Sequence, residues 1–303
     1  MGQRTKHWLR LPLPIAASLG LLAGVALGWS QGIAMPFTVP MGQAQNPKVW
    51  NGPPTKRVGI KVKVTSGVVR AEGPADVTLG QVVSGTACLF EGNFADFNVI
   101  AQGQGPATGS TVISQEGAIG DTSRLIGSDS TTLPLPGGGA SVLFYASSDP
   151  LPGLPRLATV RAGTNQVSVT GGSGVLVGVD PGDWTFCSKT TTKYGLTGSG
   201  TADWAVFDMP SAAECPAWEY SGTASRQQGD TGDAVYVDGT ANLTIRITNT
   251  GTSDITVSCT GAAVPPSNPV VPGAFAEVTG TLTSLYWMYT GAGGQVTILV
   301  KKP

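Results

Sequence analysis

The side chains best suited to chemistry in this sequence are aspartates in glycine-rich turns. Asp230, Asp233 and Asp238 cluster in GDTGDAVYVDG, and Asp180 and Asp183 lie in DPGDW. Calcium takes about six to eight oxygen ligands, which such turns supply from carboxylates and backbone carbonyls. Asp230, Asp233 and Asp238 are therefore weak calcium candidates. The alternative is that these aspartates only close turns between strands.

Two short motifs resemble the catalytic segments of aspartic proteases, but each likeness is confined to three letters. Asp121 lies in DTS and Asp230 in DTG. In that family two such aspartates share a proton. An apolar run leads into each catalytic aspartate there, whereas AIG and RQQG precede these two. Because Asp-Thr-Gly is also a favourable turn sequence, we expect turns here and not a catalytic dyad.

Several other kinds of catalytic site are excluded by residue type or by motif. His7 is the only histidine and precedes a long apolar segment, so a Ser-His-Asp or Cys-His site in the rest of the chain is excluded. No P-loop, nucleophile elbow or dinucleotide-binding glycine motif occurs. Glu214 and Glu219 flank Trp218, but nothing places a second acid opposite them, as glycoside cleavage requires. We predict that the protein is not an enzyme and needs no metal or cofactor.

Four cysteines predict two disulfides. Cys88, Cys187, Cys215 and Cys259 are an even number with wide spacing and no CxxC pair. The pairing Cys88–Cys187 with Cys215–Cys259 keeps each bridge within one expected domain. The alternative is four buried free thiols.

The sequence SLYWMYT predicts an unusual strand with large side chains on both faces. Tyr286 would lie on one face and Trp287 and Tyr289 on the other. One interpretation is a contact with a partner, and another is a platform on which sugars stack. The favoured one is a central strand covered by the segment PSAAECPAWEY. The candidate interface aromatics are Trp218, Tyr286, Trp287 and Tyr289.

The N-terminal segment reads as a membrane anchor. Residues 1–10 carry Arg4, Lys6 and Arg10, and no charged side chain follows until after Trp29. Residues 11–30 are predicted to form one transmembrane helix, since the 19 uncharged residues from Leu11 to Trp29 would span roughly 28 Å in a helix. The basic flank places the N-terminus in the cytoplasm and the remainder outside, in the periplasm or the extracellular space.

Two further features of this segment bear on its role. Gly20, Gly24 and Gly28 recur every fourth residue and predict a face on which another membrane helix packs. Gly32 and Ala34 form a small-x-small signal before Met35, so a cleaved signal peptide is the alternative. We expect the N-terminal segment to be retained as an anchor.

The rest of the chain predicts an all-β protein. Only 12% of residues are charged and 43 of 303 are glycine, a composition that favours turn-rich β-structure. Val58, Ile60, Val62 and Val64 alternate with polar residues and glycine, as in a half-buried strand. We expect a proline-rich tether without regular structure over 31–56, then antiparallel β-sandwich domains, immunoglobulin-like or jelly-roll-like, at 57–200 and 201–303.

These features predict a structural function at a membrane. Without Arg4, Lys6 and Arg10 the exported part has 15 basic against 19 acidic residues, and no basic cluster indicates nucleic acid. The leading hypothesis is an accessory subunit of an integral-membrane complex, or an envelope or virion surface component. Its partners would be the bilayer and other membrane proteins. The alternative is a tethered carbohydrate- or cell-binding module.

Overall fold

The computed structural model describes most of the chain after residue 27. The described residues are 28–118, 124–133, 142–147, 156–163, 167–171, 174–179, 182–188, 193–208, 220–226, 233–237, 242–261, 269–289 and 294–301. Within these ranges no helix has the length and apolar character needed to cross a bilayer. The expected membrane helix, with Gly20 and Gly24, lies outside the described residues.

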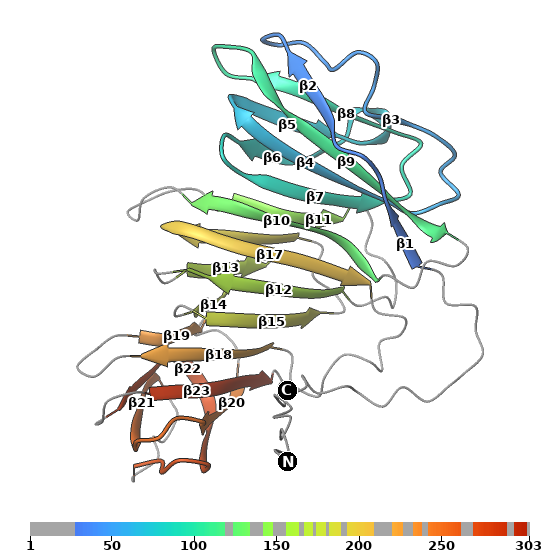
Figure 1. The fold of residues 1–303 in the computed structure, drawn as a ribbon. Helices are drawn as coiled ribbons and strands as arrows, with labels where there is room; N and C mark the ends of the chain where they lie inside the picture. Colours follow the sequence, from blue (N-terminus) through green and yellow to red (C-terminus); the bar gives the residue numbers. More distant parts are fainter. Residues whose placement is uncertain are drawn as a thin grey trace, which may run out of the picture.

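The predicted all-β, antiparallel character is confirmed. The described elements are strands, apart from one short 3-10 turn, η1 (Pro74–Asp76). One long sheet runs through the whole stack of strands in Figure 1. Its order is β1 (Gly28–Gln31) and β2 (Met35–Val39), both on β9 (Ala107–Ala118), then β4 (Val58–Ser66), β7 (Ala87–Gly92), β11 (Val142–Ser147), β16 (Lys193–Gly198), β13 (Val167–Gly171), β14 (Gly174–Val179), β19 (Asp233–Val237), β22 (Phe275–Tyr289) and β21 (Ile255–Gly261).

Two further sheets pack on the long sheet. The small sheet has the order β3 (Trp50–Asn51), β8 (Asp96–Gln102), β5 (Val68–Glu72) and β6 (Thr78–Val83). The second sheet has the order β10 (Leu125–Leu133), β17 (Gly200–Asp208), β12 (Arg156–Ala162), β15 (Gly182–Ser188), β18 (Tyr220–Arg226), β23 (Gly294–Lys301), β20 (Asn242–Asn249) and the first half of β22. Because β22 pairs in both sheets, it joins their ends.

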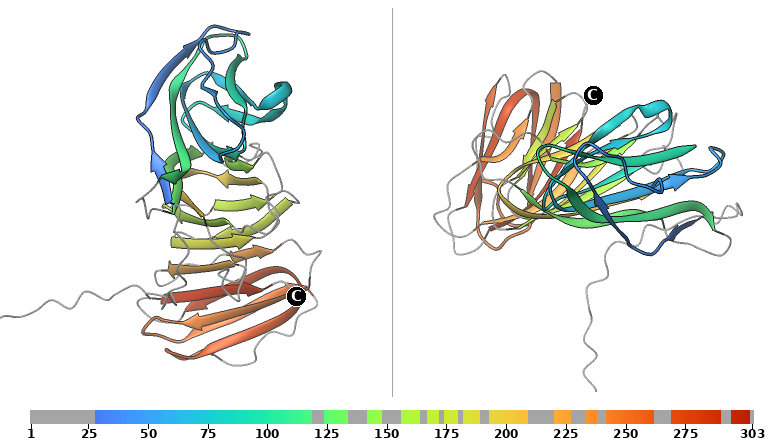
Figure 2. Two further views of the ribbon diagram at one scale, coloured as in Figure 1. Left: turned by 90° about the vertical axis from the view of Figure 1, so that its right-hand side faces the viewer. Right: turned by 90° about the horizontal axis from the view of Figure 1, so that it is seen from above.

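The long sheet carries a different core on each face. All six residues of β7 are buried. Cys88 and Phe90 belong to the first core, under the small sheet, whereas Ala87 and Leu89 belong to the second core, under the second sheet. Strand β7, which contributes to both cores, pairs in parallel with β11. The other pairings among the described strands are antiparallel. Figure 2 shows the resulting elongated stack from two directions.

Strand β4 follows the pattern read from its sequence. Val58, Ile60, Val62 and Val64 are fully buried in the first core, as their alternation predicts. Gly59 points to the opposite face, where an added Cβ would lie 2.6 Å from Ile126 Cγ2 of β10. A larger residue there would require the side chains of Ile126 and Ser114 to shift, so glycine suits the close approach of β10 to β4.

Two expectations about the N-terminal region are wrong. Residues 31–56 are not an unstructured tether, because β2 pairs with β9 along five residues and buries Phe37 and Val39. The predicted helix cannot extend to residue 30, because Gly28 and Trp29 belong to strand β1, which pairs with the end of β9. Gly28 is therefore part of a sheet and not of a helix-packing face. Strand β1 could not be recognised in the sequence because its residues continue the uncharged run of the predicted helix.

The strand ladder also continues across the expected domain boundary at residue 200. Strand β17 begins at Gly200 and pairs with β10 on one side and β12 on the other. Farther down the stack in Figure 1, β18 pairs with β15, and β19 pairs with β14. In the second sheet, strand β17 from 201–303 thus lies between two strands from 57–200, and in the long sheet the strands of the two segments adjoin without a break.

Candidate functional site: a buried ionic junction

A cluster of charged side chains lies where the end of the second sheet meets the long sheet. Its members come from distant parts of the chain and from six strands, with one arginine just before β4. They are Trp29 (β1), Arg57, Glu91 (β7), Glu116 (β9), Tyr145 (β11), Arg156 (β12) and Asp208 (β17). We call this set the ionic junction.

Glu91 is the centre of the ionic junction and is completely buried. Its Oε1 accepts hydrogen bonds from Arg57 Nη2 and Arg156 Nη2, both at 2.6 Å. Its Oε2 accepts from Arg156 Nε at 2.8 Å and from the Tyr145 hydroxyl at 2.9 Å. Both carboxylate oxygens therefore have charged partners, which is the condition under which a buried charge is tolerated.

Asp208 connects this centre to the N-terminal strand. Its Oδ1 accepts from Arg156 Nη1 at 2.8 Å, and its Oδ2 accepts from Trp29 Nε1 at 3.0 Å. The Arg57 guanidinium lies 5.4 Å from the centre of the Trp29 ring, in cation–π range. Trp29 itself is 1% exposed and packs in the second core. Strand β1 is thus held by sheet pairing, by apolar packing and by charge.

The electrostatics of the ionic junction favour ionised groups at its centre. Burial opposes ionisation of Glu91, but the hydrogen bonds and charges of Arg156 and Arg57 outweigh it, so its pKa lies below the usual value. Burial and the neighbouring Glu91 charge raise the pKa of Tyr145 well above its ordinary value. At the half-buried margin, burial raises the pKa of Glu116 despite the nearby Arg57.

This geometry suits fastening and not acid–base chemistry. A general acid or base must reach a substrate proton, but the Glu91 oxygens are already engaged in hydrogen bonds with Arg57, Arg156 and Tyr145. The ionic junction joins β1, both large sheets and the boundary between the two cores. Its hydrogen bonds and ion pairs hold these parts of the fold together.

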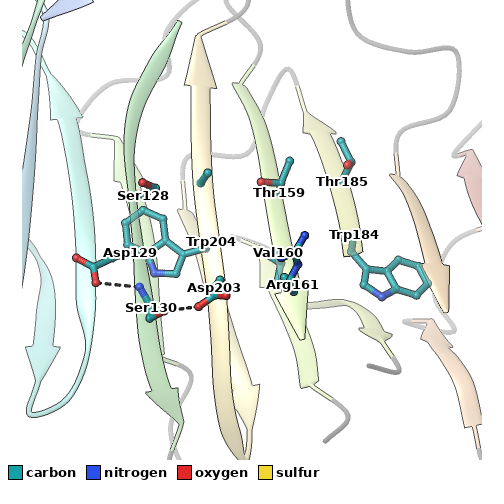
Figure 3. Close-up of a pocket in the computed structure, with 11 residues that line it drawn as sticks. Ser128, Asp129, Ser130, Thr159, Val160, Arg161, Trp184, Thr185, Asp203 and Trp204 are labelled. Atoms are coloured by element: carbon teal, nitrogen blue, oxygen red, sulfur yellow. Dashed lines mark hydrogen bonds between the residues drawn. The ribbon is translucent and has the colours of Figure 1, made fainter. Parts of the chain in front are cut away.

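The second candidate site is a surface trough of about 650 Å³ on the outer face of the second sheet. Figure 3 shows that its lining residues come from four adjacent strands, β10, β17, β12 and β15. The lining residues with side chains on the outer face are Ser128, Ser130, Thr159, Arg161, Thr185, Asp203 and Ala205.

The predicted disulfide between Cys88 and Cys187 is wrong. Cys88 is a free thiol buried in the first core, and burial raises its pKa well above the ordinary value. Cys187 belongs to β15 of the second sheet, on the other side of the long sheet. The backbone of Cys259 lies in β21, and Cys215 lies outside the described residues.

The calcium candidates are not brought together in the described part of the chain. Asp233 lies in β19 opposite Tyr286, and Asp230 and Asp238 lie outside the described residues. Among the described side chains, no group of three or more histidine, cysteine or acidic residues is placed to hold a metal.

The aromatic strand is an interior strand of the long sheet. Tyr286, Trp287 and Tyr289 belong to the second half of β22, which pairs with β19 on one side and β21 on the other. Trp218 and the covering segment expected over this strand lie outside the described residues.

Sequence reasoning missed the ionic junction. Of its members, sequence reasoning mentioned only Trp29, and assigned it to the end of the predicted membrane helix. One signal was present: Glu91 is a lone charge in ACLFEG, whose apolar character predicts burial. Its partners could not be identified, since they are spread between positions 29 and 208.

Comparison of the sequence with known protein families and with curated proteins finds no match.

Proposed function

We propose that this chain is a non-catalytic, membrane-anchored structural protein whose exported β-sheet body covers or stabilises a larger membrane assembly. That assembly is an integral-membrane complex, or an envelope or virion surface. The observation that carries the proposal is the position of strand β1. It follows the apolar run without a spacer, and Trp29 is fixed in the ionic junction.

The position of β1 supports retention of the N-terminal segment. Cleavage after Ala34 would remove all of β1, and with it Trp29 from the second core. A segment whose sole role is export has no reason to supply a buried tryptophan and a partner for Asp208. Retention therefore agrees with a body that is built around its own anchor.

The sequence before β1 remains long enough for an anchor. Residues 11–27 contain no charged side chain, and 17 residues in a helix span about 26 Å, at the lower end of what a bilayer requires. Arg4, Lys6 and Arg10 precede this run and favour a cytoplasmic N-terminus. A short helix that continues directly into β1 would fix the height and orientation of the body above the membrane.

The chemistry of the described residues agrees with a structural role. The most buried charges are committed to one another, and the surface trough is polar and open. A rigid attachment suits a protein that must hold a fixed place in an assembly. A binding module on a flexible tether does not need such a rigid attachment.

The test is gentle extraction of native membranes, followed by purification of the full chain. We expect the chain to stay in membranes washed at alkaline pH and to co-purify with other membrane proteins at fixed stoichiometry. Gly24→Leu should release those proteins while the chain stays in the membrane. The control Ala23→Leu, one position away on the predicted helix, should release nothing. A chain that is washed off, or that purifies alone under every condition, would contradict the proposal.

A further inference from the structure

We propose that the trough on the outer face of the second sheet binds a neutral saccharide. This site is distinct from the aromatic strand β22, on which a sugar platform was expected from the sequence. The inference is independent of the anchor, since a membrane-bound structural protein without this site would still satisfy the proposed function.

The trough is built from two polar rows that cross the sheet. Strand register places Ser128, Ala205, Thr159 and Thr185 side by side in one row. A second row, two residues along each strand, contains Ser130, Asp203 and Arg161. Residues directly opposite on neighbouring strands share a face, so hydroxyls and a charged pair lie together on this surface.

The row between these two faces the interior. Trp204, Val160 and Trp184 are paired in register and are each at most 2% exposed in the second core. The indole N–H of Trp204 donates to the buried Thr131 hydroxyl at 3.1 Å, which keeps that ring inward. The trough therefore has a rigid support, and its exposed lining is polar.

The two carboxylates at the trough, Asp129 and Asp203, each have a basic residue beside them. Asp129 lies opposite Trp204, on the inner face at one end of the trough, where it accepts from Lys63 at 2.7 Å and forms an ion pair with Lys61 at 2.9 Å. Burial disfavours its charge, but the two lysines outweigh this and lower its pKa. Asp203 lies directly opposite Arg161 and accepts a hydrogen bond from the Ser130 hydroxyl. A strongly ionic ligand would have to compete with these neighbouring charges.

A polyhydroxylated ligand fits this lining better than an apolar or an ionic one. The Asp203 carboxylate accepts hydrogen bonds from sugar hydroxyls, and the serine and threonine hydroxyls both donate and accept. The volume of about 650 Å³ falls within the usual range of about 300–1,000 Å³ for small-ligand sites. The methyl group of Ala205 and those of the threonines offer small apolar contacts to sugar C–H groups.

The experiment is titration calorimetry of the full chain in lipid nanodiscs, free of sugar-based detergents. The probes are short neutral oligosaccharides of glucose, mannose, galactose and N-acetylglucosamine. We expect at least one to bind, and Asp203→Asn to weaken binding about tenfold or more, since a hydrogen bond to a charged group contributes about 1.5–3 kcal/mol. Thr159→Arg should abolish binding because its side chain fills the trough.

Each variant has a matched control at the far end of the same sheet face. Glu277 faces Arg246 across β22 and β20 as Asp203 faces Arg161, so Glu277→Gln should leave binding unchanged. Thr248→Arg is the control for Thr159→Arg, since both threonines alternate with core residues. The proposal is overturned if no oligosaccharide binds, if the controls weaken binding as much as the trough variants, or if binding requires an acidic sugar and disappears in salt.

Discussion

The indole N–H of Trp29 donates a 3.0 Å hydrogen bond to Asp208 although 179 positions separate the two residues in sequence. Trp29 is the second residue of β1, and Asp208 is the last residue of β17. The bond therefore attaches the strand nearest the predicted membrane segment to the end of β17 in the second sheet. A force on that segment would reach both large sheets through one group of side chains.

Replacement of Trp29 should destabilise the whole body. Trp29→Ala removes a buried aromatic side chain, and we expect a loss of about 3–5 kcal/mol in the free energy of unfolding. Trp29→Phe keeps most of the ring and should cost less. The control is Trp50→Phe, which loses a similar 3.0 Å hydrogen bond, to Phe94, outside the ionic junction. Denaturant titration of the full chain measures all three. Equal effects of Trp29→Phe and Trp50→Phe would argue against a special role for the junction.

Neutralising Glu91 should lower the free energy of unfolding by more than its ion pairs contribute to it, because two buried arginines lose their counter-charge. Glu91→Gln leaves Arg57 and Arg156 without their central counter-charge, and breaking a buried pair costs about 3–5 kcal/mol. Tyr145→Phe removes only one donor to Glu91 and is the milder variant if Glu91→Gln does not fold. In a double-mutant cycle, Arg156→Met should cost much less in the Glu91→Gln background. Additive losses would show that the two residues are not coupled.

The ionic junction should make the protein sensitive to acid. Folding lowers the pKa of Glu91, chiefly because Arg156 and Arg57 outweigh the effect of burial. Such a group stabilises the folded state fully above its unfolded pKa of about 4.3, and this stabilisation is lost as the pH falls through the folded pKa. We expect unfolding free energy to fall below about pH 4.3 more steeply in the natural chain than in Glu91→Gln. Parallel pH profiles would contradict this assignment.

Cys88 should react as a buried free thiol. It lies in the first core, where burial raises its pKa and keeps it protonated and shielded. An alkylating reagent should leave Cys88 unmodified in the folded chain and modify it after denaturation without a reductant. Peptide mass spectrometry measures this directly. Labelling of Cys88 only after reduction would restore the disulfide that the sequence suggested.

The alternation of apolar and polar residues predicted strands well, because alternate side chains of a strand lie on the same face of the sheet. Val58, Ile60, Val62 and Val64 were assigned to one buried face from their spacing alone, and all four are fully buried. The sequence could not predict that the opposite face of neighbouring β7 also carries a core. That arrangement depends on β10 and β17 returning from later in the chain, which no local pattern encodes.

Hydrophobicity alone misled the prediction at the N-terminus. Gly28 and Trp29 continue an uncharged run, so sequence reasoning assigned them to the membrane helix, whereas they form a strand. An apolar tryptophan satisfies a membrane interface and a protein core equally well. Only the partners Arg57 and Asp208 distinguish the two, and these come from other strands.

The central claim is that β1 stays with the body as the continuation of its anchor, and intact mass measurement of the native chain tests it most directly. We expect a mass that includes residues 1–34, found in the membrane fraction. A mature chain that begins at Met35, released from the membrane and folded without Trp29, would contradict the account.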